Sequence, residues 1–223
     1  MKFGVVVFPG SNCDRDMIEA LQHELKQEVI QLWHKDKDLG MFNTDDCIVL
    51  PGGFSYGDYL RCGAIARFSP MMQSVIEFAN KGGKVLGVCN GFQILCESGL
   101  LPGVLLRNSQ QQFVCNNVFI KEAAAVSCEA LMIPVAHGEG RFFANDATLE
   151  SMEMHRQVIY RYCDEKGNIN AAANPNGAIH NIAGICNKER NVFGMMPHPE
   201  RAVNTALGNV DGKNVFNHLF GIN

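Results

Sequence analysis

The chain lacks the sequence signs of several large classes of protein. No two of its nine cysteines are three residues apart, so it has no Cys-x-x-Cys pair for zinc binding or thiol redox chemistry. No apolar stretch approaches the roughly 18 residues of a membrane span, and the first apolar run stops at Pro9, too early for a secretory signal. We therefore predict a cytoplasmic protein with reduced thiols, no metal site and no membrane partner.

Positive charge is also scarce. The sequence has 19 Lys and Arg against 23 Asp and Glu, a formal net charge of −4, which argues against a nucleic-acid partner. Internal repeats, low-complexity tracts and linker-like changes of composition are absent. With 223 residues, of which 47% are hydrophobic, the sequence predicts one globular domain over residues 1–223.

The order of apolar segments indicates an α/β fold. In the first half, buried-type strands alternate with amphipathic helices, a pattern typical of a parallel sheet covered by helices on both faces. The second half is richer in strand patterns. Strands are predicted at 3–8, 29–32, 47–50, 84–88, 113–120, 131–136, 157–163, 182–187 and 192–195, and helices at 14–25, 70–80, 90–98 and 213–219.

Cys89 lies where a predicted strand runs directly into a predicted helix, in the segment KVLGVCNGFQ at 84–93. Gly87 and Gly91 stand two residues to either side, as in a nucleophile elbow that presents a thiol at the carboxyl end of a sheet. A buried structural cysteine in a tight turn is the alternative. Most of the other cysteines are expected to act as small buried hydrophobes.

A thiol nucleophile needs a base and donors for an oxyanion. The segment MPHPE at 196–200 places His198 and Glu200 two residues apart, each directly after a proline, and these prolines favour extended backbone, so the carboxylate could orient the imidazole. The N–H of Asn90 and an N–H of the PGGF turn at 51–54 are candidate oxyanion donors. A surface turn at 196–200 and an ordinary tight turn at 51–54 are the alternatives.

Three motifs together resemble the class I glutamine amidotransferases: GVCNGFQ at 87–93, PGGFSYGD at 51–58 and PHPER at 197–201. Further segments narrow the resemblance to the subfamily that supplies ammonia to phosphoribosylformylglycinamidine synthase in purine biosynthesis. These segments are FPGSNCD at 8–14, DYLRCGAIA at 58–66, LPGVLLRN at 101–108 and AHGEGRF at 136–142. The resemblance spans almost the whole chain and implies a single-domain amidotransferase fold with a mostly parallel central sheet.

The resemblance also implies roles for individual residues. Cys89 would attack the side-chain amide of L-glutamine, His198 would transfer protons, and Glu200 would orient His198. The N–H groups of Gly53 and Asn90 would form the oxyanion hole. Residues implied in substrate binding are Gly52, Gln93, His137 and Arg141, of which His137 and Arg141 would alternatively face the partner subunit. The alternatives for Gln93 and His137 are a solvent-facing helix residue and a structural histidine.

The family reaction implies partners, because it consumes ATP and Mg²⁺ and this chain has no phosphate-binding loop. We expect no cofactor on this chain, a large synthetase subunit that uses ATP and Mg²⁺, and a small third subunit. A different thiol hydrolase on the same scaffold and a non-catalytic binding subunit are the two other functions considered.

Overall fold

Five apolar segments form a parallel half-sheet in the computed structural model, which describes residues 1–124 and 129–222. Its strands occur in the order β2, β1, β3, β4 and β11, and each pairs in parallel with its neighbour. Their bounds are β1 Lys2–Val7, β2 Glu28–Trp33, β3 Cys47–Leu50, β4 Lys84–Val88 and β11 Val192–Met195. Strands β3 and β11 are buried at every residue, as their continuous apolar sequences require.

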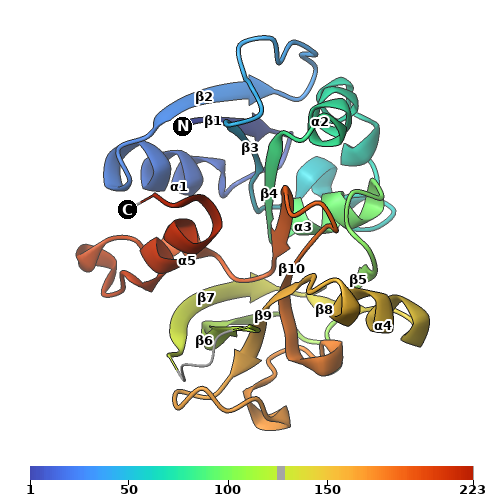
Figure 1. Ribbon diagram of the computed structural model, residues 1–223, viewed down its shortest axis with the longest axis vertical. Coiled ribbons are helices and arrows are strands. Elements are labelled where there is room, and N and C mark those ends of the chain that lie inside the picture. Colours follow the sequence, from blue (N-terminus) through green and yellow to red (C-terminus); the bar gives the residue numbers. More distant parts are fainter. Residues whose placement is uncertain (125–128, 223) are drawn as a thin grey trace.

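Four antiparallel strands extend the same sheet, in the order β10, β9, β6 and β7 after β11. They span β6 Val114–Glu122, β7 Leu131–His137, β9 Val158–Cys163 and β10 Ile182–Cys186. A separate small sheet pairs β5 Val104–Leu106 with β8 Arg141–Phe143. Burial alternates along β7, so one face of that strand packs inward. The antiparallel part lies below the parallel part in Figure 1.

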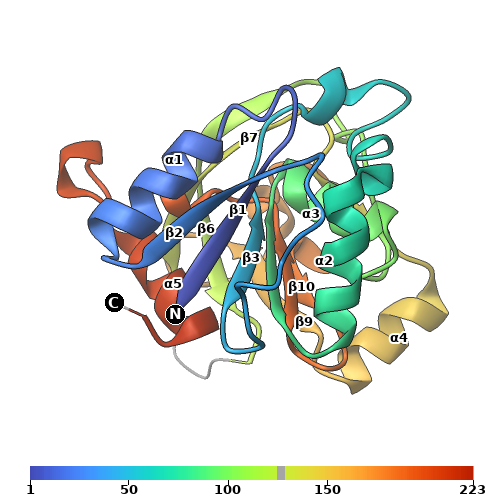
Figure 2. The same cartoon turned by 90° about the horizontal axis from the view of Figure 1, so that it is seen from above.

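Helices cover both faces of the parallel part. α1 and α5 lie on one side of the strands, and α2 and α3 lie on the other (Figure 2). The helices are α1 Asp14–Glu19, α2 Pro70–Asn80, α3 Asn90–Glu97, α4 Asp146–Met154 and α5 Asp211–Phe220. A π-helical turn, Ala20–Glu24, extends α1. Ser69 caps α2 by accepting a hydrogen bond from the N–H of Met72, and Pro70 follows as the first helical residue.

The predicted α/β architecture is confirmed, including the parallel first half and the β-rich second half. Three elements are not among those predicted. β5 and β8 have only three residues each, too few for a periodic signal. α4 buries only Leu149 and Met152, so its apolar stripe is weak, although Asn145 caps it by accepting from the N–H of Thr148.

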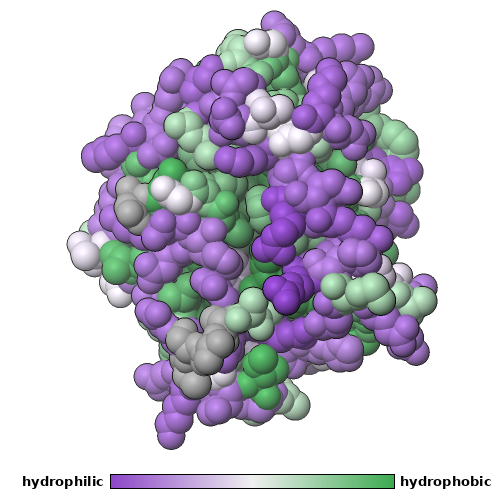
Figure 3. All heavy atoms as spheres, viewed as in Figure 1, coloured by the Kyte–Doolittle hydropathy of each residue, from purple (hydrophilic) through white to green (hydrophobic). Residues whose placement is uncertain are grey.

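The surface is largely polar on the face seen in Figure 3, where apolar residues form small, separate patches. The cysteines outside 125–128 are free thiols; most are buried or partly buried, and Cys115 is exposed. Cys128 lies outside the described residues. Among residues 1–124 and 129–222, no helix combines the length and apolar character needed to span a bilayer.

Two glycines let α3 approach the sheet at backbone distance. A Cβ atom on Gly91 would lie 1.8 Å from the carbonyl oxygen of Leu50, the last residue of β3. A Cβ atom on Gly87 would lie 2.6 Å from the carbonyl of Gly91. A larger residue at Gly91 would force α3 away from β3, and one at Gly87 would force α3 away from β4, so the strand-to-helix turn at Cys89 depends on both glycines.

We predict that Gly91→Ala destabilises the fold by about 3 kcal/mol or more, because a backbone carbonyl cannot move aside for the added methyl group. Gly138→Ala is the matched control, since its Cβ would meet only Phe113 at an ordinary 3.6 Å. Urea unfolding of both variants measures the difference. Equal unfolding free energies for the two variants would contradict the prediction.

Candidate active site

Cys89 occupies the turn between β4 and α3 in a strained conformation. Its φ of +51° and ψ of −105° are rare for a residue with a side chain, and its N–H donates a hydrogen bond to the carbonyl of Met195 at 2.8 Å. Its Sγ lies 3.7 Å from the carbonyl oxygen of Ala136. The sulfur faces a cavity of about 140 Å³ lined by Asn12, Cys13, Gly53, Phe54, Cys89, Phe113, Ala136, His198 and Arg201.

His198 and Glu200 form a buried pair beside this cavity. The Nδ1 of His198 lies 2.7 Å from Oε1 of Glu200, and both residues are almost fully buried. The N–H of His198 donates to the carbonyl of Pro134 at 2.8 Å, which ties the segment after β11 to β7. The Nε2 of His198 finds no hydrogen-bond partner among the described residues. The imidazole is therefore oriented by Glu200 at one nitrogen and open for proton transfer at the other.

The charge of Glu200 decides the protonation of His198. Burial disfavours a charged imidazole, but the neighbouring Glu200 carboxylate and the sulfur of Cys89 outweigh it and raise the pKa of His198 well above its ordinary value. Removing the carboxylate would leave only the sulfur of Cys89 to oppose the effect of burial on the pKa of His198. The pair is thus suited to hold an imidazolium when a proton arrives from Cys89.

The 51–54 turn brings Gly52 against His198 and Gly53 against the backbone of the 11–12 segment. A Cβ on Gly52 would lie 2.7 Å from Cε1 of His198, so only glycine leaves room for the imidazole. Gly53 has a φ of +134° and packs against the backbone N of Asn12, where a Cβ would lie 2.7 Å away. Gly53 lines the cavity with Cys89, and Asn90 follows Cys89 as the first residue of α3. Their use as oxyanion donors stays a prediction.

His137 is buried at the end of β7 and is held as a neutral ring. Its Nε2 accepts a hydrogen bond from Nδ2 of Asn176 at 2.9 Å. Asn108 donates to the carbonyl of His137 and accepts from the N–H of Gly140, which pins the loop 137–141. Burial, assisted by the charge on His198, lowers the pKa of His137 to about 4.

Four residues predicted to bind glutamine stand outside the described wall of the cavity: Gly52, Gln93, His137 and Arg141. Gln93 is buried rather than solvent-facing, and its Nε2 donates to the carbonyl of Glu139 at 2.7 Å. Arg141 begins β8, and its Nε is buried without a partner among the described residues. Contact of these four residues with substrate stays a prediction.

Several residues that line the cavity are not among the predicted site residues: Asn12, Cys13, Phe54, Phe113, Ala136 and Arg201. Five of them lie inside segments that carry the family resemblance, so these motifs could have indicated them as cavity residues. Phe113 lies outside those segments, so only the tertiary structure places it there. The half-exposed rings of Phe54 and Phe113 leave the rim of the cavity apolar.

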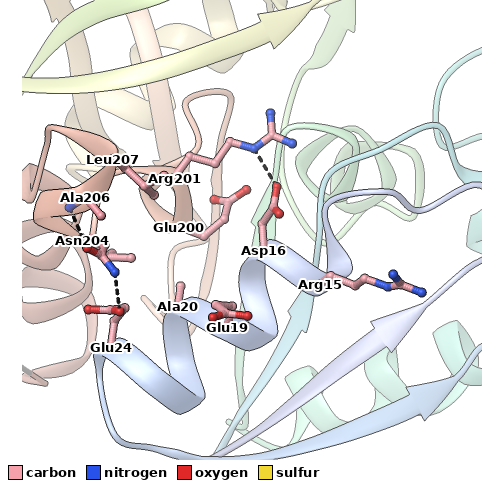
Figure 4. A pocket seen from close by; sticks show the side chains of 11 residues that line it. Arg15, Asp16, Glu19, Ala20, Glu24, Glu200, Arg201, Asn204, Ala206 and Leu207 are labelled. Atoms are coloured by element: carbon pink, nitrogen blue, oxygen red, sulfur yellow. Dashed lines mark hydrogen bonds and ion pairs between the residues drawn. The ribbon is translucent and has the colours of Figure 1, made fainter.

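A second cavity of about 510 Å³ lies between α1 and the segment that follows Glu200 (Figure 4). Arg201 lines both cavities; its Nε donates to Asp16 at 2.9 Å and its Nη2 to the Sγ of Cys13 at 3.2 Å. Asn204 donates to Glu24 at 2.7 Å on the far side of the cavity. These contacts attach the segment after His198 to α1.

We predict that His137→Gln reduces the acid sensitivity of the fold. Between pH 6.5 and about 4, the unfolded chain takes up a proton on His137 that the folded chain does not, so stability falls with pH through this window. Over this whole pH window, the proton uptake lowers the free energy of unfolding by about 3 kcal/mol. Urea unfolding at pH 8, where the ring is neutral in both states, and at pH 4.5 measures the slope. Parallel pH profiles for the two proteins would contradict the prediction.

Comparison with known proteins identifies the family of this chain. The model of the CobB/CobQ-like glutamine amidotransferase domain matches residues 1–217. Subunit PurQ of phosphoribosylformylglycinamidine synthase from Gloeobacter violaceus is 53% identical over 227 residues, covering 98% of this chain and 97% of the relative. The corresponding protein from Moorella thermoacetica is 54% identical over 221 residues, covering 96% and 92%.

Among solved structures, PurLQS from Thermotoga maritima contains a similar chain, with a TM-score of 0.83 and 38% identity over 99% of this chain and 97% of that chain. The resemblance first drawn from the three motifs is thereby confirmed. The chain belongs to the CobB/CobQ-like glutamine amidotransferase family.

Proposed function

We propose that this chain is the glutaminase subunit of a phosphoribosylformylglycinamidine synthase. The observation that carries the proposal is that His198, paired with the buried Glu200, lines one small cavity together with the strained Cys89. Relatives more than 50% identical over nearly the whole chain are named as subunits of that synthase. The site supplies the acyl-transfer chemistry that such a subunit needs.

In the first half of the proposed reaction, Nε2 of His198 takes the proton of the Cys89 thiol, and Sγ forms a bond to the amide carbon of glutamine. The N–H groups of Gly53 and Asn90 stabilise the negative oxygen. The imidazolium then protonates the amide nitrogen, the carbon–nitrogen bond breaks, and ammonia leaves behind a thioester. Glu200 stabilises the transient imidazolium at 2.7 Å.

The second half hydrolyses the thioester. Neutral His198 removes a proton from water, and the resulting hydroxide attacks the thioester carbon. The carbon–sulfur bond then breaks, glutamate leaves, and the proton returns from His198 to Cys89. The sum is glutamine plus water to glutamate plus ammonia. The small cavity and the apolar rim of Phe54 and Phe113 limit the access of bulk water during this cycle.

The ammonia passes to an ATP-dependent synthetase subunit, which converts formylglycinamide ribonucleotide to the amidine. We place ATP and Mg²⁺ on that partner, because this sequence has no phosphate-binding loop. The name of PurLQS from Thermotoga maritima, which contains a related chain, supports an assembly with other subunits. We propose that these are a large synthetase subunit and a small third subunit, and that the assembly is cytoplasmic.

We predict that Cys89→Ala abolishes glutamine-dependent amidation in the reconstituted complex but leaves ammonium-dependent amidation intact. The nucleophile is lost, whereas the partner still receives ammonia from solution. Cys115→Ala is the matched control, because Cys115 is exposed on β6, outside the described wall of the cavity. Steady-state rates with each nitrogen source measure the effect. Full glutamine-dependent activity of Cys89→Ala would refute the mechanism.

We predict that Glu200→Gln lowers kcat for glutamine hydrolysis by about 10²- to 10⁴-fold with little change in KM. The neutral amide stabilises an imidazolium less than the carboxylate does, and the pKa of His198 falls because Glu200 no longer opposes the effect of burial. Kinetics of the complex and NMR titration of His198 measure the two effects. A variant within twofold of the wild-type kcat would show that Glu200 has no role in proton transfer.

A further inference from the structure

The side-chain amide of Asn90 joins the nucleophile turn to the 51–58 segment. Its Oδ1 accepts a hydrogen bond from the N–H of Ser55 at 3.1 Å. Its Nδ2 donates to Oδ1 of Asp58 at 3.2 Å and to Oε1 of Gln93 at 2.9 Å. Asn90 is almost completely buried, so these contacts replace solvent at every polar atom of the amide.

Gln93 extends this network to the third segment of the site. Its Nε2 donates to the carbonyl of Glu139 in the loop 137–141, at 2.7 Å. The amides of Asn90 and Gln93 thus connect the first turn of α3 with two loops that lie 35 and 46 residues away in sequence. The contacts of Asn90 with Ser55 and of Gln93 with Glu139 are not needed to form α3, because on the helix they use side chains rather than the backbone.

The 51–58 segment needs such an anchor, because its backbone is strained. Tyr56 and Asp58 have left-handed φ values, at +54° and +53°. On one side, the N–H groups of Phe54 and Tyr56 donate to carbonyls of the 9–10 turn. On the side of α3, the segment is tied by the contacts of Ser55 and Asp58 with Asn90.

We propose that the side chain of Asn90 is a positioning residue for the oxyanion hole. It holds the 51–58 segment so that the N–H of Gly53 and the N–H of Asn90 itself face the same substrate oxygen. The inference rests on the proposed function, because it assumes a tetrahedral intermediate on Cys89. The elbow pattern implicated only the backbone N–H of Asn90, and the proposal adds a role for its side chain.

The chemistry of the site selects asparagine. The position needs one acceptor for Ser55 and two donors for Asp58 and Gln93, at the reach of a short side chain. Aspartate lacks the donors, serine offers a single proton, and leucine offers none. Glutamine has the right atoms, but its extra methylene has no room in a buried position.

The test compares Asn90→Ala with Asn191→Ala in the reconstituted complex. Asn191 is a matched control: it is also buried, and its Nδ2 donates to the carbonyls of Ala79 and Gly83, at the opposite end of β4 from Cys89. We measure kcat and KM for glutamine hydrolysis and, separately, the rate at which iodoacetamide alkylates Cys89. Alkylation forms a carbon–sulfur bond and expels iodide, with no oxyanion to stabilise.

We expect Asn90→Ala to lower kcat by about 10- to 100-fold, less than the loss of a whole oxyanion donor, with KM little changed. Alkylation of Cys89 stays near the wild-type rate, and Asn191→Ala keeps its kcat. A kcat within twofold of wild type in Asn90→Ala overturns the inference. Equal slowing of hydrolysis and alkylation also overturns it, because the substitution would then have reduced the reactivity of the Cys89 thiol rather than the stabilisation of the oxyanion.

A second variant covers the case in which Asn90→Ala fails to fold. The exchange Asn90→Asp with Asp58→Asn keeps the acceptor for Ser55 and restores the contact between positions 58 and 90 with donor and acceptor reversed. We expect its hydrolysis-to-alkylation ratio to stay near that of wild type, because both contacts with the 51–58 segment are kept, whereas Asn90→Asp alone lowers the ratio by placing two carboxylates together. A ratio for the exchange as low as that of Asn90→Asp alone overturns the inference. Loss of the proposed function itself would show differently, as a wild-type complex that does not hydrolyse glutamine.

Discussion

The approach of α3 to the end of β3 is the contact on which the rest of the site depends. With no side chain at Gly91, the helix backbone comes so near Leu50 that a methyl group would overlap its carbonyl. This closeness forces the sharp turn in which Cys89 takes a positive φ. It also brings Asn90 within hydrogen-bond distance of Ser55. The positions of the Cys89 thiol, of the 51–58 segment and of α3 therefore all depend on this one backbone contact.

The two buried histidines show how pairing decides charge. His198 and His137 are both almost fully buried, and burial alone would leave both neutral. Glu200 reverses this for His198 through a hydrogen bond of 2.7 Å. His137 meets a neutral amide, that of Asn176, and the charge on His198 pushes its pKa further down. One imidazole is thus prepared to carry a proton while the other stays neutral and structural.

Local patterns predict much of this molecule, because its chemistry lies at strand ends. The apolar runs place most strands within a few residues, and the elbow at Cys89 and the His198–Glu200 pair lie in short, self-contained segments. What escapes local patterns is contact between segments far apart in sequence. Gln93 was expected to face solvent or substrate, but α3 is buried through most of its length, and its amide meets Glu139 across 46 residues. Phe113 reaches the cavity from just before β6, without a motif of its own.

The antiparallel extension of the sheet has a part in the site that strand order alone would not suggest. β7 stands four strands from β11, yet the N–H of His198 donates to Pro134 of β7, and Sγ of Cys89 faces Ala136 of the same strand. The extension must therefore curl back over the carboxyl end of the parallel strands. Its backbone fixes the imidazole from one side while Met195 of β11 holds the N–H of Cys89 from the other. His198 and Cys89, the proposed base and nucleophile, are thus positioned by main-chain hydrogen bonds from two halves of one sheet, which leaves their side-chain atoms free for the proposed proton transfer.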